Sequence, residues 1–219
     1  MTDVTGARII ALHAGPVRTE RFGVKRMTTA ICKRPVIGPI QAGTLGLEGD
    51  EQADRRYHGG PSRALCCYVR EHQEAWGTEW GRAVAPGEFG ENLTLAGIDE
   101  TTAHIGDRFR IGAALVEVAS ARGPCGILAA RTGFPDIVAR IRENGWTGWY
   151  LRVLEPGLMT AGDRYTLESA HPAAISVAEA YRIKLDKGGP AEPVQRLLTV
   201  AALCPEWRAK LVARLAERG

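Results

Sequence analysis

The sequence predicts a mainly β fold, in which a barrel-like domain with a few helices precedes a small all-α module. Short apolar or alternating runs bounded by Gly, Pro or Asp fill the first 170 residues. Few helical patterns interrupt these runs, and a closed or nearly closed barrel leaves few strand edges exposed. The composition changes after "HPAAIS", where helical patterns take over. We therefore expect a β-barrel domain over residues 1–169 and a three-helix module over residues 170–219.

The expected strands share a short length and an apolar or alternating pattern, which is typical of antiparallel strands. Two of them begin alike, with "IGDRFRI" from Ile105 and "AGDRYTL" from Ala161, and a Gly-Asp pair suits entry through a tight turn. "LTL", after Asn92, is also strand-like. In chain order the six main runs are "ARIIAL", "ALCCYV", "RFRI", "ALVEVA", "WYLRVL" and "RYTLE".

Two helices are expected among the strands. "VREHQEAWGTEW" has Trp76 and Trp80 four residues apart, so one face can be buried. "FPDIVARI" has four apolar residues at the helical spacing i, i+3, i+4 and i+7. These are Phe134, Ile137, Val138 and Ile141.

Three further helical patterns make up the tail. Ser176 and Glu179 form a capping box that opens a helix through Tyr181. Pro205 lies at the expected first position of the third helix, where its missing N–H costs nothing. The apolar faces of the second and third helices are formed by Val194, Leu197, Leu198 and Ala201, and by Trp207, Leu211 and Leu215.

Charge and hydropathy exclude several classes of protein. The formal net charge is +3, and the eight basic and five acidic residues from Ala170 onward account for all of it. The neutral body argues against a nucleic-acid binder, and the last helix has Trp and Leu where a recognition helix needs base-reading side chains. The first residues lack a secretory signal, and no apolar run approaches the roughly 20 residues of a membrane span. We expect a cytoplasmic protein that binds neither nucleic acid nor membrane.

The cysteine and histidine pattern supports no metal or disulfide framework built from the chain alone. An odd number of cysteines without any Cys-x-x-Cys pair argues against disulfides, a zinc ribbon and an iron–sulfur cluster. Cys66 and Cys67 are adjacent, so at most one faces any pocket, and core packing is expected for both. Cys32 and Cys204 are read as structural residues, and His13, His72, His104 and His171 as surface or turn residues.

Three stretches carry the candidate chemistry. The first, "GLEGDEQADRRYHGGPSRALCCY", has Gly59 and Gly60 after His58, which would let backbone N–H groups approach a ligand. Arg56 and Arg63 could bracket an anion there. The alternative interpretation is a polar hairpin loop with solvated charges.

The second stretch, "PGEFGENLTLAGID", places Asn92 before a strand. Its amide could read a heterocycle edge, or it could hold a turn together. The third, "SARGPCGI", holds Cys125 in a turn between Pro124 and Gly126, with Arg122 favouring the thiolate. One thiolate is a poor zinc site but suffices for a metal that arrives chelated by soft sulfur donors. The alternative is an inert, packed cysteine.

Taken in order, these stretches resemble the MOSC family, in its YiiM-like branch with a C-terminal three-helix extension. "FGENLTLAGI" with "IGDRFRIG" and the opening segment "AICKRPVIGPI" add to the resemblance. It implies a barrel-like fold that binds molybdenum cofactor, with Cys125 as the catalytic residue and metal ligand. Thr29 stands where serine is expected, and Cys67 where histidine is expected. The resemblance implies further cofactor-binding positions at Asn92, Glu91, Gly90, His58, Gly59, Gly60, Arg63, Arg122, Lys33 and Thr29, with Lys33 a candidate for the cofactor's phosphate.

Proteins similar to this one reduce N-hydroxylated compounds such as hydroxylaminopurines and amidoximes, which implies a detoxifying oxidoreductase. With no flavin or iron–sulfur cluster expected in the chain, an external flavoprotein or similar carrier would supply the electrons. A homodimer is left open. Two alternatives remain: a sulfur carrier with a persulfide on Cys125, and a cofactor-binding or storage protein.

Overall fold

The protein is described by a computed structural model that covers residues 6–56 and 58–217. Residues 1–5, Tyr57 and residues 218–219 lie outside the described residues; they include the first residues of the chain, in which no secretory signal is expected, and the last two positions of the predicted three-helix module.

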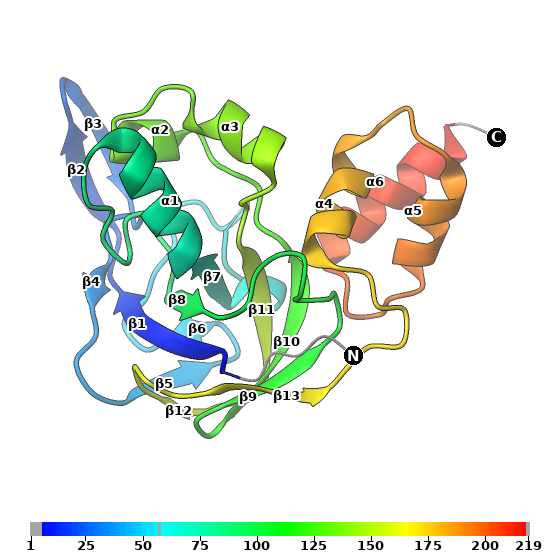
Figure 1. Ribbon diagram of the computed structural model, residues 1–219, viewed down its shortest axis with the longest axis horizontal. Coiled ribbons are helices and arrows are strands. Elements are labelled where there is room, and N and C mark those ends of the chain that lie inside the picture. The colour runs from blue at the N-terminus through cyan, green and yellow to red at the C-terminus, as the bar shows by residue number, and fades with distance from the viewer. Residues whose placement is uncertain (1–5, 57, 218–219) are drawn as a thin grey trace.

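A curled eight-stranded sheet forms the body, and its two ends approach each other as in a half-open barrel (Figure 1). Arg8 bridges Arg164, and the Tyr165 N–H donates to the Ala7 carbonyl at 2.8 Å. All neighbouring strands are antiparallel except β7 and β8, which are parallel. The mainly β, barrel-like fold class is therefore confirmed. The spatial order is β13 (Tyr165–Ser169), β9 (Arg108–Ile111), β10 (Ala114–Ala121), β11 (Trp149–Glu155), β7 (Leu65–Val69), β8 (Leu93–Ala96), β1 (Arg8–Ala14) and β4 (Arg34–Pro35).

Every main strand run of the sequence forms a strand of this sheet. The two runs that begin alike pair with each other, since Tyr165 of β13 lies opposite Ile111 of β9. Gly106 and Gly162, which precede them, have φ values of 90° and 95°, so the tight turns do use the left-handed region.

Two smaller sheets complete the body and have no clear signal in the sequence. One contains β12 (Gly157–Met159), β5 (Ile40–Gly43) and β6 (Gly46–Leu47). The other is a hairpin of β2 (Arg18–Phe22) and β3 (Lys25–Thr29). These strands are short or mostly polar, so no apolar run marks them.

Three helices cover one side of the sheet: α1 (Arg70–Trp80), α2 (Ile127–Thr132) and α3 (Ile137–Asn144) (Figure 1). The first and third were expected, although α3 begins three residues after Phe134, whose ring instead stacks on Trp80 at 4.0 Å between centroids. The short α2 was not expected. A second hydrophobic cluster joins the three helices; its buried members are Ile31, Tyr68, Trp76, Val84, Phe89, Leu128, Ile137 and Ile141.

The tail forms α4 (Val177–Leu185), α5 (Ala191–Leu198) and α6 (Pro205–Ala216). Ser176 caps α4 by accepting the Glu179 N–H at 3.1 Å, and Pro205 is at the start of α6, both as predicted. Helix α5 ends before Ala201, which is exposed, and Val200 is buried in its place. The predicted apolar face was wrong at that one position because the helical period stops at Leu198.

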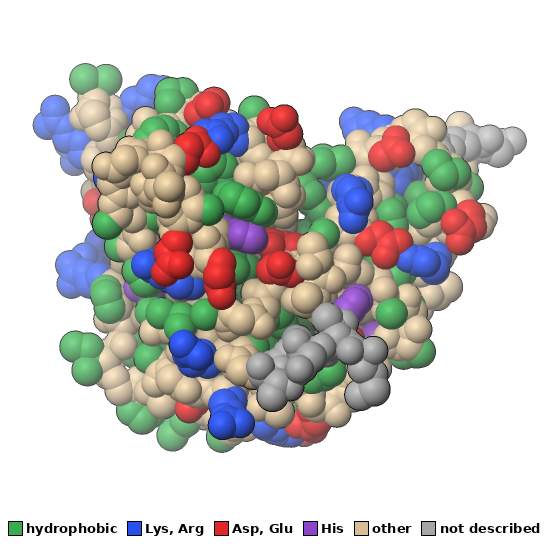
Figure 2. Space-filling model, viewed as in Figure 1, with side chains coloured by type: hydrophobic (Ala, Val, Ile, Leu, Met, Phe, Trp, Pro, Cys, Tyr) green, Lys and Arg blue, Asp and Glu red, His purple; other side chains and the backbone are tan. Residues whose placement is uncertain are grey.

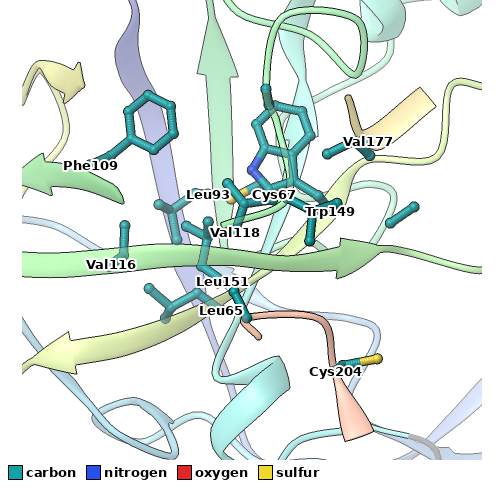
Figure 3. Close-up of a cluster of buried hydrophobic side chains, with 14 of the residues drawn as sticks. Leu65, Cys67, Leu93, Phe109, Val116, Val118, Trp149, Leu151, Val177 and Cys204 are labelled. Carbon is teal, nitrogen blue, oxygen red and sulfur yellow. The ribbon is translucent and has the colours of Figure 1, made fainter. Parts of the chain in front are cut away.

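One hydrophobic core runs from the sheet into the tail (Figure 3). Val118 and Trp149 of the sheet belong to the same buried cluster as Val177 of α4 and Cys204 before α6. The Cys204 N–H also donates to the Ala119 carbonyl of β10 at 3.0 Å. The tail is thus packed onto β10; a boundary at residue 169 stays a prediction.

Basic and acidic side chains alternate over the face in Figure 2, with no extended field of one sign at its centre. Among the described residues no helix is long and apolar enough to span a membrane.

Candidate functional site

A cavity of about 680 Å³ lies where the body meets the tail. Its walls come from segments far apart in the chain: the end of the β2–β3 hairpin, the loop before β7, the loop before β8, the loop after β10, and the tail. Nine of the expected site residues line it: Thr29, Lys33, His58, Gly59, Arg63, Gly90, Asn92, Arg122 and Cys125.

Cys125 lies in the loop between β10 and α2 and is partly exposed. Its carbonyl accepts the Leu128 N–H at 3.1 Å, which fixes the turn into α2, and its side chain packs against the second hydrophobic cluster. Gly126 has φ −64°, a value open to any residue, so this turn does not depend on a left-handed glycine at that position. Cys125 therefore lines the cavity on a loop that is anchored by packing.

Arg122 places a permanent positive charge in the cavity wall. It is 6 % exposed, and its Nη2 donates to the Phe89 carbonyl. Burial lowers the pKa of Arg122, but interactions with Cys66, Tyr150 and Cys125 outweigh burial and raise it above its ordinary value. Arg122 thus brings a buried positive charge to the part of the wall that also contains Cys66 and Cys125.

Asn92 is held by a network that uses both hydrogens of its amide. Its Nδ2 donates to the His13 carbonyl at 3.1 Å and to Asp50 Oδ2 at 2.9 Å, and its Oδ1 accepts the Cys66 N–H at 3.0 Å. Asp50 also accepts from the Gly15 N–H at 3.0 Å and from Lys33 Nζ. Asn92 thus holds β7 against β8, and its amide has no hydrogen left to donate to a ligand. Of the two interpretations of Asn92, this favours a structural residue over one that recognises a heterocycle.

The same network pairs the positive charge of Lys33 with a carboxylate. The Lys33 and Asp50 side chains are 7 % and 1 % exposed and form a buried ion pair. The charge expected to meet a phosphate is therefore already paired within the protein. Lys33 lines the cavity, but its contact with Asp50 makes it a poor free cation.

His58 and Arg63 frame another part of the wall. Burial lowers the pKa of His58, and the nearby positive charges of Arg122 and Arg63 lower it further. His58 is consequently neutral at neutral pH. Arg63 is ion-paired with Glu206 of α6 at 3.2 Å, which ties the loop before β7 to the tail.

Several expected positions lie elsewhere. Glu91 is fully buried and accepts hydrogen bonds from Gln73, Gly87 and Thr94, so its carboxylate serves the fold. Gly60 precedes a short 3-10 helix (Pro61–Arg63) and does not line the cavity. Arg56 is paired with Asp54 at the surface, so it does not bracket an anion with Arg63 as expected.

The expectations for three cysteine and histidine positions were also wrong. Cys66 lines the cavity whereas Cys67 is in the core, since adjacent strand residues face opposite sides. His13 is buried, and His72 is buried with its Nε2 2.7 Å from Glu100 Oε2. The surface or turn assignment therefore fails for both histidines.

Sequence analysis missed most of the polar wall. Asp50 lies in the first of the three stretches but was not singled out there, and Tyr150 and Ser120 lie inside strands that read as core. The tail residues in the wall were read only as helix pattern or surface. They are Lys184, Glu206, Trp207 and Lys210.

Comparison with known proteins accounts for both parts of the chain. The family model described as "MOSC domain" matches residues 54–166, and that described as "YiiM-like, 3-alpha helix domain" matches residues 175–218. The chain belongs to the MOSC domain family. Cys125, Arg122 and His58 lie in the MOSC domain, whereas the tail part of the cavity wall lies in the three-helix domain.

Relatives extend the match over nearly the whole chain. The uncharacterized protein YflK of Bacillus subtilis is 37 % identical over 94 % of this chain and 93 % of its own length. Protein YiiM of Escherichia coli is 39 % identical over 82 % of this chain and 81 % of its own. The crystal structure of YiiM from Geobacillus stearothermophilus has a TM-score of 0.81 and 31 % identity, covering 95 % of this chain and 99 % of that one.

A third relative is much longer. A Gibberella moniliformis protein named "Reductase" is 32 % identical over 80 % of this chain, which spans only 32 % of that protein.

Proposed function

We propose that this MOSC protein is a molybdenum-cofactor-dependent reductase of N-hydroxylated compounds of the hydroxylaminopurine or amidoxime type. The observation that carries the proposal is the position of Cys125 in the lining of a cavity of about 680 Å³, whose wall also contains the charged guanidinium of Arg122. The name of the longer Gibberella relative supports reductase chemistry, although that name describes the whole of a protein three times the matched length.

The donor set of the cavity fits such a cofactor. Within the described ranges, no three His, Cys, Asp or Glu side chains gather where they could hold a metal ion. A metal bound at Cys125 must therefore bring its own soft ligands, as a dithiolene does. The volume of about 680 Å³ is in the range of sites for small molecules and cofactors.

The chain's own residues have distinct tasks in this proposal. Cys125 would supply the protein's single sulfur ligand, and Arg122 would stabilise negative charge beside it. Asn92 and Asp50 hold their own part of the wall in place through their hydrogen bonds. His58, neutral at neutral pH because of burial, can accept or donate a proton at its ring.

The overall reaction breaks the N–O bond of an R–NHOH substrate, consumes two electrons and two protons, and yields R–NH2 and water. When bound, the molybdenum cofactor supplies the two-electron chemistry of this reaction. An external electron-donor protein, a flavoprotein or similar carrier, would deliver the electrons.

Anaerobic purification followed by molybdenum and pterin analysis tests the proposal. We expect about one molybdenum per chain and reduction of a hydroxylaminopurine by a dye reductant. Cys125→Ser should abolish both the metal and the turnover. Cys32→Ser is the matched control, because Cys32 is partly buried but does not line the cavity.

Two other results would replace the proposal. Metal-free protein with cyanide-labile sulfur on Cys125 would indicate a sulfur carrier. Bound cofactor without turnover under a strong artificial donor would indicate a storage protein.

A further inference from the structure

The tail contributes a cationic wall to the cavity. Lys184 is at the end of α4, and Trp207 and Lys210 are in the first half of α6; all three line the cavity. Lys184 Nζ lies over the Trp207 ring, 4.2 Å from its centroid. This cation–π contact holds the half-buried lysine in place.

Lys184 reaches the loop that carries Cys125. A β-carbon built on Gly123 would lie 3.7 Å from Lys184 Nζ, and Gly123 is two residues before Cys125. The ammonium group therefore lies close to the loop that carries Cys125, although it comes from the tail.

The charges of this wall repel one another. Burial lowers the pKa of Lys184, and the positive charges of Lys210, Arg63 and Arg142 lower it further. Across residues 6–56 and 58–217, no carboxylate forms an ion pair with Lys184 or Lys210, whereas Arg63 has Glu206. Two lysines that line one cavity without an ion-pair partner of their own among the described residues, while Glu206 of the same wall is paired with Arg63, form a site for a multiply charged anion. Phosphate is the common ligand of this kind.

We propose that Lys184 and Lys210 bind the phosphate of the substrate, so that the protein prefers N-hydroxylated nucleotides to the free bases or nucleosides. This inference rests on the proposed reductase function and specifies its substrate class. A phosphate monoester could also belong to the cofactor. We assign the site to the substrate because Cys125, Arg122 and His58 all come from the MOSC domain, which leaves the tail wall to the second ligand.

Binding to the full-length protein tests the subsite without requiring turnover. Titration calorimetry with adenosine 5′-monophosphate and with adenosine should show about tenfold tighter binding of the nucleotide. The variant Lys184→Gln/Lys210→Gln should lose this preference, and Lys184→Arg/Lys210→Arg should keep most of it. The control Lys25→Gln/Arg26→Gln removes the same charge from the exposed β2–β3 hairpin, outside the cavity, and should retain the preference.

Activity and cofactor content separate the remaining outcomes. With N-hydroxylated adenosine monophosphate, the Gln variant should lose about tenfold in kcat/KM, chiefly through KM, and it should lose less on the free base. Equal binding of nucleotide and nucleoside by the wild type would overturn the inference. So would loss of pterin from the Gln variant, since the phosphate would then be the cofactor's. If reductase activity is absent but the nucleotide preference is lost in the Gln variant, the proposed function fails and the phosphate subsite stands.

Discussion

Replacing Asp50 by Asn tests the buried network behind the cavity. The change keeps the shape of the side chain but leaves the ammonium of Lys33, 7 % exposed, without its counter-ion. Breaking a buried pair by removing one partner costs about 3–5 kcal/mol. In a protein of this size each kcal/mol lowers Tm by about 2–4 °C, so the melting temperature should fall by roughly 6–20 °C. Thermal and urea unfolding at neutral pH would measure the loss.

Two controls make the result specific. Glu74→Gln removes an exposed i,i+4 partner of Arg70 and should cost about 0.5 kcal/mol or less. Adding Lys33→Met to Asp50→Asn should restore part of the stability, because no buried charge is then unpaired. A loss below about 1 kcal/mol for Asp50→Asn would refute the buried pair. Lys33 would then be free to meet a phosphate, as the resemblance to the MOSC family implies.

Two further predictions concern a glycine and a histidine. Gly148→Ala should lower the free energy of unfolding in urea by much more than Gly145→Ala. Both glycines have positive φ, but only at Gly148 would the new β-carbon lie 2.1 Å from the Cys67 carbonyl oxygen. Equal losses of stability would contradict this contact. Because burial lowers the pKa of His58 below its ordinary 6.5, the unfolded chain takes up a proton first as pH falls, so stability should decline below about pH 6.5 and be unaffected above it. His58→Asn should remove part of that slope, and an NMR titration showing His58 protonated at pH 7 would contradict the prediction.

The strands were predictable wherever burial produced an apolar or alternating run. The hairpin of β2 and β3 has no such run, because its residues are mostly exposed and polar. The hairpin is defined by the antiparallel pairing of Arg18 with Thr29 and of the residue pairs that follow toward the turn. No local pattern of apolar residues reveals this pairing. The short α2 was missed for a related reason: six residues are too few to establish a helical period.

The site was predictable where chemistry is unusual in its local context, as at Cys125. It was not predictable where a role depends on contacts between distant segments. Asp50 has its function only because Lys33 and Asn92 meet it in space. Strand alternation correctly implied that at most one of Cys66 and Cys67 faces a pocket, but the sequence did not say which.

The core shared by β10 and the tail has a consequence for synthesis of the chain. A ribosome delivers β10 before α4, which packs against it, and before Cys204, whose N–H meets Ala119. Until then the strand presents apolar surface that attracts chaperones or other nascent chains. A premature stop codon within the tail should therefore produce an aggregating fragment rather than a shortened protein with an intact cavity.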